Sequence, residues 1–339
     1  MLYPFWDALD APIIWQGLNI YDNYTKIGKS FFQISENPLD ADFALLPNDW
    51  KRYERSGKEK LAEEFVNKAR GFDLKTVVFF HSDFEYTIPL SDIIVFRTSL
   101  SSKKRKSFEF AMPGWSGDLR NLFPTDNSNT SPDSDKPRVS FCGASRSNSF
   151  SLWRQIKEFV KKHFYKNRYR FNALNFRYNI LLSLGKSNLI ETDFILRDSY
   201  LGNLKKDDKD ILKNLGKRRK EYFDNMVSSQ YVLCLRGVGN FSYRFYEAIS
   251  MGRIPVFINT DCVLPFENFL NYSEFIVWVE PKDLMRIDEL ILDHYTKLGQ
   301  SGLADLQNKL RSIWEEYLSP EGFFKNLHLI LDPLKTDKA

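Results

Sequence analysis

Short apolar runs alternate with polar and amphipathic segments along the first part of the chain. The runs ALLP, KTVVFF and DIIVFR, ending at residues 47, 80 and 97, have the apolar and β-branched character of buried strands. Between the first two, residues 59–70 place apolar side chains at helical spacing before a glycine. This strand–helix–strand order predicts a layered α/β unit with a parallel sheet.

The same alternation begins again after a polar interruption. Residues 124–137, PTDNSNTSPDSDKP, contain almost nothing that a core would bury, which is typical of a linker or a long surface loop. Strand-like runs then begin near residues 138, 191, 231, 254 and 276, and helices are predicted at 149–164, 209–229, 242–252, 266–275 and 281–294. We therefore expect a second parallel α/β domain.

The interruption also sets the predicted domain boundaries. Residues 1–135 are expected to form the first Rossmann-like domain and residues 136–304 the second, with the amphipathic tail 305–339 packing back onto the first. The fold class is α/β. Ligands of open parallel sheets bind at the carboxyl ends of the strands, close to helix N-termini. The residues that follow each strand are therefore the candidates for function.

The near balance of basic and acidic residues argues against a nucleic-acid-binding protein. The 339 residues include 48 basic and 44 acidic ones, and a net charge of +4 is far from the excess of a dedicated nucleic-acid-binding protein. Basic clusters stand at residues 103–106, 161–170 and 217–220. Such clusters are usually solvated faces of helices or loops, and the alternative is attraction to an anionic membrane surface. We expect no nucleic-acid partner.

Cysteine usage and hydropathy indicate the compartment. Cys142, Cys234 and Cys262 have no metal-ligand spacing, and thiols within apolar runs are expected to be buried and reduced. The N-terminal residues carry early acids and no signal-peptide pattern, and no stretch is long and apolar enough to span a membrane. We expect a cytoplasmic protein, with at most a peripheral association with the inner face of the membrane.

The segment 234–258, CLRGVGNFSYRFYEAISMGRIPVFI, gathers charges that a purely structural helix would not need. Arg236 and Gly237 end a predicted strand, and a glycine-containing turn then leads to a helix that Ser242 is placed to cap. Arg244 falls in the first helical turn, where a cation opposes the helix dipole. A guanidinium at that position suits a bound phosphate, which it holds through two parallel hydrogen bonds.

Glu247 lies three residues after Arg244, on the same predicted helix face. A carboxylate accepts hydrogen bonds from two neighbouring hydroxyls, such as those of a ribose. The segment therefore predicts a nucleotide diphosphate site. The alternative is an ordinary surface ion pair between Arg244 and Glu247, beside glycines that only make a turn.

The stretch 229–269 resembles the signature segment of the exostosin-type glycosyltransferases. That family carries a strand, Arg-Gly, a turn with Gly and Ser, Arg-x-x-Glu-Ala, a Gly, an Ile-Pro-Val strand and Leu-Pro-Phe before an acid, all present here in order. Weaker similarity reaches DADFALLP, FFHSDFEY and RVSFCGASRSN. The second of these departs from the family, because Ser82 is inserted and no glycine follows Phe84.

The resemblance implies a GT-B fold, with two Rossmann-like domains facing a central cleft and the nucleotide-sugar donor bound by the second. It also implies a UDP-sugar donor, no bound metal and no cofactor, with arginines stabilising the departing diphosphate. Carried onto this chain, Arg236 and Arg244 with Gly237 and Ser242 serve the diphosphate, and Glu247 serves the ribose. Glu267 binds the donor or caps the following helix, and Arg146 is a further candidate for the diphosphate or an ordinary loop arginine.

An inverting transfer needs a general base on the acceptor hydroxyl. The polar group HSDFEY follows a strand of the first domain, and we rank its candidates Asp83, His81 and Glu85. They are otherwise structural or bind the acceptor. Trp115 and Asp118, in PGWSGDL, are candidates for an acceptor loop, although tryptophan also packs cores.

The sequence thus predicts an inverting glycosyltransferase, a hexosyl- or pentosyltransferase, that moves a sugar from a nucleotide-sugar to a hydroxyl of a growing glycan in surface polysaccharide synthesis. The acceptor is a glycan or a lipid-linked glycan. One alternative is a fucosyltransferase-like enzyme that uses a GDP-sugar. The other is a non-catalytic exostosin-like binding protein.

Overall fold

The computed structural model describes residues 27–28, 30–35, 37–114, 118–122, 135–145, 172–197 and 211–335. Trp115 and Arg146, the predicted helix 149–164 and most of the polar stretch 124–137 lie outside these residues. The chain divides into two compact units. Unit 1 consists of Met1–Trp115, Cys262–Phe266 and Glu315–Ala339, and unit 2 of Ser116–Asp261 and Glu267–Trp314.

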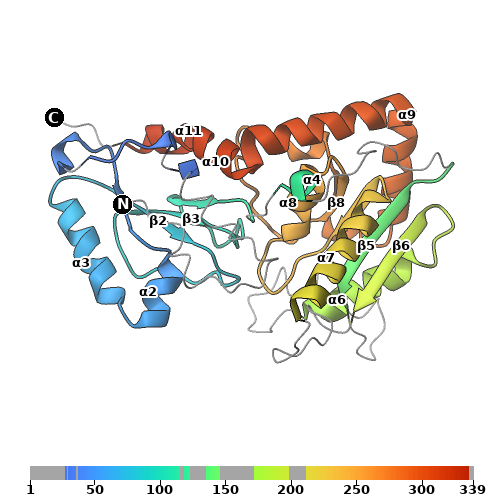
Figure 1. Ribbon diagram of the computed structural model, residues 1–339, viewed down its shortest axis with the longest axis horizontal. Coiled ribbons are helices and arrows are strands. Elements are labelled where there is room, and N and C mark those ends of the chain that lie inside the picture. The colour runs from blue at the N-terminus through green and yellow to red at the C-terminus, as the bar shows by residue number, and fades with distance from the viewer. Residues whose placement is uncertain are drawn as a thin grey trace. The chain divides into compact units, whose positions relative to one another are not determined.

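Unit 1 contains a four-stranded parallel sheet in the order β1-β2-β3-β4, of which Figure 1 labels the central strands β2 and β3. Every residue of the two central strands is buried, which explains their continuous apolar runs. Two helices pack on β2, and α3 turns Ala62, Val66 and Ala69 inward. The elements are β1 (Ala44–Leu45), α2 (Trp50–Ser56), α3 (Glu59–Arg70), β2 (Thr76–Phe80), β3 (Ile93–Arg97) and β4 (Glu109–Ala111).

Unit 2 contains a five-stranded parallel sheet in the order β6-β5-β7-β8-β9. Because all the strands are parallel, their carboxyl ends share one edge of the sheet. α7 packs on β5 (Figure 1), and α8 packs on both β7 and β8. The elements are α4 (Leu119–Leu122), β5 (Arg138–Ala144), α6 (Ala173–Leu184), β6 (Glu191–Arg197), α7 (Ile211–Val227), β7 (Tyr231–Cys234), α8 (Tyr243–Ser250), β8 (Ile254–Ile258), β9 (Val277–Val279) and α9 (Ile287–Ile313).

The chain passes more than once between the units. After α9 a π-helical turn (Trp314–Leu318) leads to α10 (Pro320–Asn326) and α11 (His328–Leu331) of unit 1. The short segment Cys262–Phe266 also belongs to unit 1, where Cys262 bridges Ser101 in antiparallel fashion.

The predicted α/β class, with two units that are each built on a parallel sheet, is confirmed. The facing of the two units across a cleft stays a prediction. The expected helix at 266–275 is wrong: a turn and a 3-10 helix (Tyr272–Glu274) stand there. Phe266 has a left-handed backbone with φ 53°, which prevents a right-handed helix from starting at that residue.

Candidate functional site

Arg244 lies in the first turn of α8 and reaches back to the carboxyl end of β5. Its Nη2 donates to the carbonyl oxygen of Cys142 at 2.6 Å. The guanidinium lies over the ring of Phe141, 4.1 Å from its centroid, and 5.6 Å from the ring of Tyr222. Its Nε is buried and makes no hydrogen bond among the described residues. The side chain is therefore held at the edge of the sheet by one carbonyl and two aromatic rings.

Gly143 makes this position possible. A Cβ atom on Gly143 would lie 2.8 Å from Nη2 of Arg244, and real Cβ atoms do not approach so closely. The glycine that ends the predicted strand RVSFCG thus has a packing reason. The missing side chain makes space for the guanidinium of Arg244, whereas the sequence alone suggested a glycine that is needed for a turn.

Arg177, on α6, covers further carbonyls at the same edge. Its Nε donates to the carbonyl oxygen of Arg236 at 3.0 Å, and its two Nη atoms donate to Ala144 and Leu235 at 3.3 Å each. Exposed carbonyls at the ends of parallel strands carry partial negative charge and repel an anion. Guanidinium groups that cover them turn the edge positive, which suits a phosphate group.

Glu247 is only 5% exposed and is held by α7, not by Arg244. Its Oε1 accepts from Arg219 at 2.6 Å and its Oε2 accepts from the hydroxyl of Tyr222. The alternative of a surface pair between Arg244 and Glu247 is therefore wrong, because each side chain bonds elsewhere. Burial and the neighbouring Glu247 raise the pKa of Tyr222 well above its usual value, so Tyr222 stays a hydrogen-bond donor.

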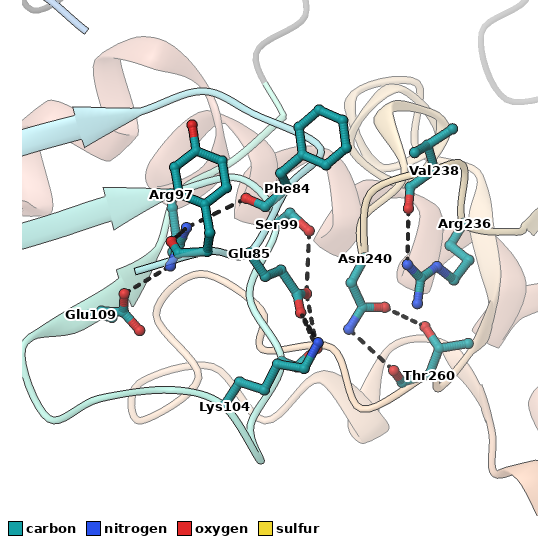
Figure 2. Close-up of polar contacts among 12 residues, drawn as sticks. Phe84, Glu85, Arg97, Ser99, Lys104, Glu109, Arg236, Val238, Asn240 and Thr260 are labelled. Atoms are coloured by element: carbon teal, nitrogen blue, oxygen red, sulfur yellow. Dashed lines mark hydrogen bonds and ion pairs between the residues drawn. The ribbon is translucent and has the colours of Figure 1, made fainter. Parts of the chain in front are cut away.

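The loop after β7 connects the predicted Arg-Gly pair to α8. Nη2 of Arg236 donates to the carbonyl oxygen of Val238 at 3.0 Å (Figure 2). The amide of the buried Asn240 donates to the Thr260 carbonyl at 3.1 Å, and the Thr260 hydroxyl donates back to Asn240 at 2.5 Å. This reciprocal pair fixes the loop to the end of β8.

Two further residues predicted to bind the donor, Gly237 and Ser242, belong to this loop. Gly237 is partly exposed, and the nearest side-chain atom to a Cβ placed there is Nη2 of Arg177 at 3.6 Å. Ser242 occupies the predicted N-cap position of α8, but its side chain makes no capping hydrogen bond. The Ser242 hydroxyl thus does not satisfy the first amides of the helix.

The remaining predicted residues of unit 2 take different places. Glu267 is exposed in the turn after Phe266, where no α-helix begins that it could cap. Asp118 makes a bidentate ion pair with Arg311 on α9, at 2.8 and 2.6 Å, and it also accepts from the backbone of Arg120 at 3.0 Å. These contacts favour a structural role for Asp118, and its role in acceptor binding stays a prediction.

In unit 1 the predicted HSDFEY cluster forms the loop after β2, called here the 81–86 loop. Buried groups hold its backbone. Oδ2 of Asp49 accepts from the amide of His81 at 2.7 Å, and the Thr98 hydroxyl donates to the Ser82 carbonyl at 3.0 Å. Arg97 donates to the carbonyl of Tyr86 at 2.9 Å. The loop is therefore fixed from its first residue to its last.

The three candidate bases on this loop differ in environment. Asp83 is exposed. Glu85 is largely buried, and its carboxylate accepts from the hydroxyls of Ser99 and Ser101 and from Lys104 (Figure 2). Burial lowers the pKa of His81 to about 4, with a further contribution from Arg55. Burial also raises the pKa of Asp49 to about 7.

The described residues contain no group of three or more His, Cys, Asp or Glu side chains arranged to hold a metal ion. Cys142 and Cys234 are buried and unbridged, as predicted, and burial raises the pKa of Cys234 to about 12. Among the same residues, no helix has both the length and the hydropathy that crossing a bilayer requires.

Sequence reasoning missed the residues that hold the site. Arg177 lies in α6, which was not predicted because its apolar residues surround the helix without a clear polar face. Arg219 was assigned to a basic cluster, yet it pairs with a buried carboxylate. A single cation inside the apolar stretch ALNFRYNILL was the available signal for Arg177.

The comparisons with known proteins concern the segment in which these residues lie. Residues 164–292, which include α6, α7, β7, α8 and β8, match the Exostosin GT47 domain. This segment of the chain is similar to the exostosin-type glycosyltransferases. The exostosin-type segment therefore contains Arg177, Arg219, Arg236, Arg244 and Glu247.

Named relatives match over the same kind of short segment. A probable glucuronosyltransferase of Oryza sativa subsp. japonica is 37% identical over 70 residues, which are 21% of this chain and 17% of that protein. The probable beta-1,4-xylosyltransferase IRX10 of Arabidopsis thaliana is 30% identical over 122 residues, 35% of this chain and 30% of that protein. The match thus spans less than a third of the length of either relative.

Among solved structures, the S. aureus TarM G117R mutant in complex with fondaparinux, alpha-GlcNAc-glycerol and UDP is similar with a TM-score of 0.36 and 12% identity. The similarity covers 78% of this chain and 53% of that one.

Proposed function

We propose that this protein is an inverting glycosyltransferase that moves a sugar from a UDP-sugar to a hydroxyl of a growing glycan. The observation that carries the proposal is the guanidinium-lined carboxyl edge of the unit 2 sheet, formed by Arg177, Arg236 and Arg244. A nucleotide-sugar presents two negative phosphates, and parallel sheets bind such ligands at this edge.

Arg244 is the residue that we assign to the diphosphate. One of its nitrogens is used on Cys142, and the aromatic rings of Phe141 and Tyr222 fix its plane. A guanidinium fixed before the ligand arrives does not have to reorganise as negative charge develops on the leaving diphosphate. This is how the site stabilises bond cleavage between sugar and phosphate, and no metal is needed for that step.

Glu247 is assigned a double role. Its two bonds to Arg219 and Tyr222 join α8 to α7. A carboxylate has about four acceptor positions, so two of them are left for the ribose hydroxyls. Because Glu247 is only 5% exposed, its bonds to Arg219 and Tyr222 are the role through which it stabilises the fold.

The acceptor hydroxyl loses its proton to a base on the 81–86 loop. Asp83 stays the first choice, because it is exposed to an incoming hydroxyl. Glu85 is the second choice, since its largely buried carboxylate already accepts hydrogen bonds from Ser99, Ser101 and Lys104. His81, with a pKa of about 4, has little affinity for a proton at neutral pH.

The test is calorimetric titration of the protein with UDP and with GDP, each with and without magnesium. Arg244→Ala removes the guanidinium, and Arg286→Ala is the matched control, because Arg286 is an exposed arginine of unit 2 whose side chain pairs with Glu289. We expect UDP to bind without metal and about tenfold or more weakly to Arg244→Ala, the loss of a charge-assisted hydrogen bond. The control should bind as the wild type does.

Two results would change the proposal. Preference for GDP would favour the fucosyltransferase-like enzyme. No binding of either nucleotide by the folded protein would refute the donor site and leave a non-catalytic exostosin-like protein. Release of UDP from a UDP-sugar in the presence of an acceptor, lost in Asp83→Asn, tests the base.

A further inference from the structure

Two aromatic rings of the 81–86 loop are displayed to solvent although the loop itself is fixed. Phe84 is 54% exposed and Tyr86 37%. Nζ of Lys51, on α2, lies 5.8 Å and 5.3 Å from the two ring centroids. It also donates to the Tyr86 hydroxyl at 3.1 Å and to Glu54 at 2.8 Å. The rings, an ammonium and a carboxylate thus form one surface, called here the Phe84 platform.

The fixing of this loop uses buried charge. Arg97 and Glu109 are almost completely buried and pair at 2.7 Å. Nη2 of the same arginine holds the carbonyls of Phe84 and Tyr86, at 3.4 and 2.9 Å (Figure 2). A buried ion pair is weak evidence for stability, because desolvation offsets much of its attraction. In this loop the clear result of the Arg97–Glu109 pair is a backbone that is held on each side of Glu85.

The Phe84 ring is separate from the candidate base. Figure 2 shows the Phe84 ring and the Glu85 carboxylate pointing to different sides of the loop backbone. Glu85 bonds to Ser99, Ser101 and Lys104, whereas the Phe84 ring lies beside Lys51 of α2, whose ammonium also bonds Glu54. The loop therefore offers two distinct surfaces.

We propose that the Phe84 platform binds a pyranose ring of the acceptor glycan, with Phe84 as the stacking residue. The face of an aromatic ring carries negative charge and attracts the C–H groups of a sugar face. The hydroxyls at the rim of the same sugar need donors and acceptors, which Lys51, Glu54 and the Tyr86 hydroxyl supply. Because the backbone of the loop is already held, binding a sugar does not have to order it, which is the benefit of the rigid loop.

Calling this sugar the acceptor rests on the proposed glycosyl transfer. The experiment therefore distinguishes failure of the Phe84 platform from failure of the proposed transfer. Saturation-transfer NMR is measured with xylotetraose, cellotetraose, chitotetraose and a chondroitin tetrasaccharide as probes, and with UDP-glucose in a separate arm. The variants are Phe84→Ala, Phe84→Trp, which keeps a stacking ring, and Lys51→Met, which removes the ammonium. Phe72→Ala is the matched control, since Phe72 is 38% exposed and precedes β2, at the opposite end of that strand.

We expect saturation transfer from the wild type to the ring C–H protons of at least one oligosaccharide. Its affinity should fall roughly threefold to tenfold in Phe84→Ala, the usual worth of one aromatic contact. Phe84→Trp should restore binding, Lys51→Met should weaken it and Phe72→Ala should leave it unchanged. UDP affinity should be the same in all of these variants.

Three results would overturn the assignment. One is no transfer to any of the four oligosaccharides, and another is equal behaviour of Phe84→Ala and Phe72→Ala. The third is a Phe84→Ala variant that loses saturation transfer only to the glucose ring of UDP-glucose, which would place the donor sugar on the platform. Oligosaccharide binding that depends on Phe84 in a protein that binds no nucleotide would support the platform and refute the donor site.

Discussion

A side chain at position 143 and the guanidinium of Arg244 would occupy the same space at the end of β5. A methyl group on residue 143 would lie 2.8 Å from Nη2 of Arg244, the atom that bonds the Cys142 carbonyl. The end of β5 is therefore shaped around the guanidinium. This relationship links a glycine of one strand to the charge of the proposed donor site.

Gly143→Ala should displace the guanidinium of Arg244 and weaken UDP binding by about tenfold, because the cation leaves its fixed position. Calorimetric titration measures the change. Gly216→Ala is the control, since a Cβ there meets nothing within 4 Å. That helical substitution should leave UDP affinity unchanged and raise the free energy of unfolding by roughly 0.5–1 kcal/mol. Equal UDP affinity in Gly143→Ala and the wild type would contradict the assignment of Arg244.

Arg177→Lys should lower the affinity for UDP more than the affinity for uridine. A lysine keeps one charge but cannot reach the three carbonyls of Ala144, Leu235 and Arg236 together, so some strand carbonyls face the phosphates again. We expect the ratio of UDP affinity to uridine affinity to fall roughly threefold to tenfold, because the lost contacts are hydrogen bonds of about 1 kcal/mol each. If both ligands weaken equally, Arg177 only supports the fold.

Arg97→Met and Glu109→Leu should each cost about 3–5 kcal/mol of unfolding free energy, because each leaves a buried charge without its partner. The double variant should recover most of that loss, which urea unfolding measures. It should still lose oligosaccharide binding at the Phe84 platform, because Arg97 no longer holds the two loop carbonyls. A double variant that is stable and binds oligosaccharide normally would show that the pair does not position the loop.

The pKa of His81 predicts a pH dependence of stability. Burial lowers this pKa from 6.5 to about 4, so between these values the unfolded chain takes up a proton that the folded protein does not. The stability that neutral His81 contributes is present above pH 6.5 and is lost as the pH falls toward 4, by at most about 3 kcal/mol. Asp49 acts in the opposite sense, since its raised pKa of about 7 means that the folded state keeps a proton longer as the pH rises.

The measurement is an NMR titration of the histidine C–H resonances, with His81→Gln to identify the His81 signal. We expect this signal to stay in its neutral position down to pH 5. A midpoint close to 6.5 would show that His81 is solvated, and His81 would then regain weight as a candidate base.

The sequence allowed the sheets to be predicted but not the contacts that build the site. β2, β3, β7 and β8 are buried on both faces, so their continuous apolar runs predict strands without knowledge of the rest. α6 lacks such a signal, because its apolar residues are spread over most of the helix and its buried side includes the polar Asn175 and Asn179. The partner of Glu247 stands 28 residues away on another helix, and nothing in local spacing favours Arg219 over Arg244.

Unit 1 is built from segments that lie far apart in the sequence, and this affects the order in which the protein folds during synthesis. Its β3 residue Phe96 is covered by Phe323, and its early residue Phe32 by Phe324, both from the segment Glu315–Ala339. All of unit 2 leaves the ribosome before that segment does. The part of unit 1 that precedes unit 2 in the chain therefore completes its core after unit 2 has been made, and until then the surface that Phe323 and Phe324 cover stays open.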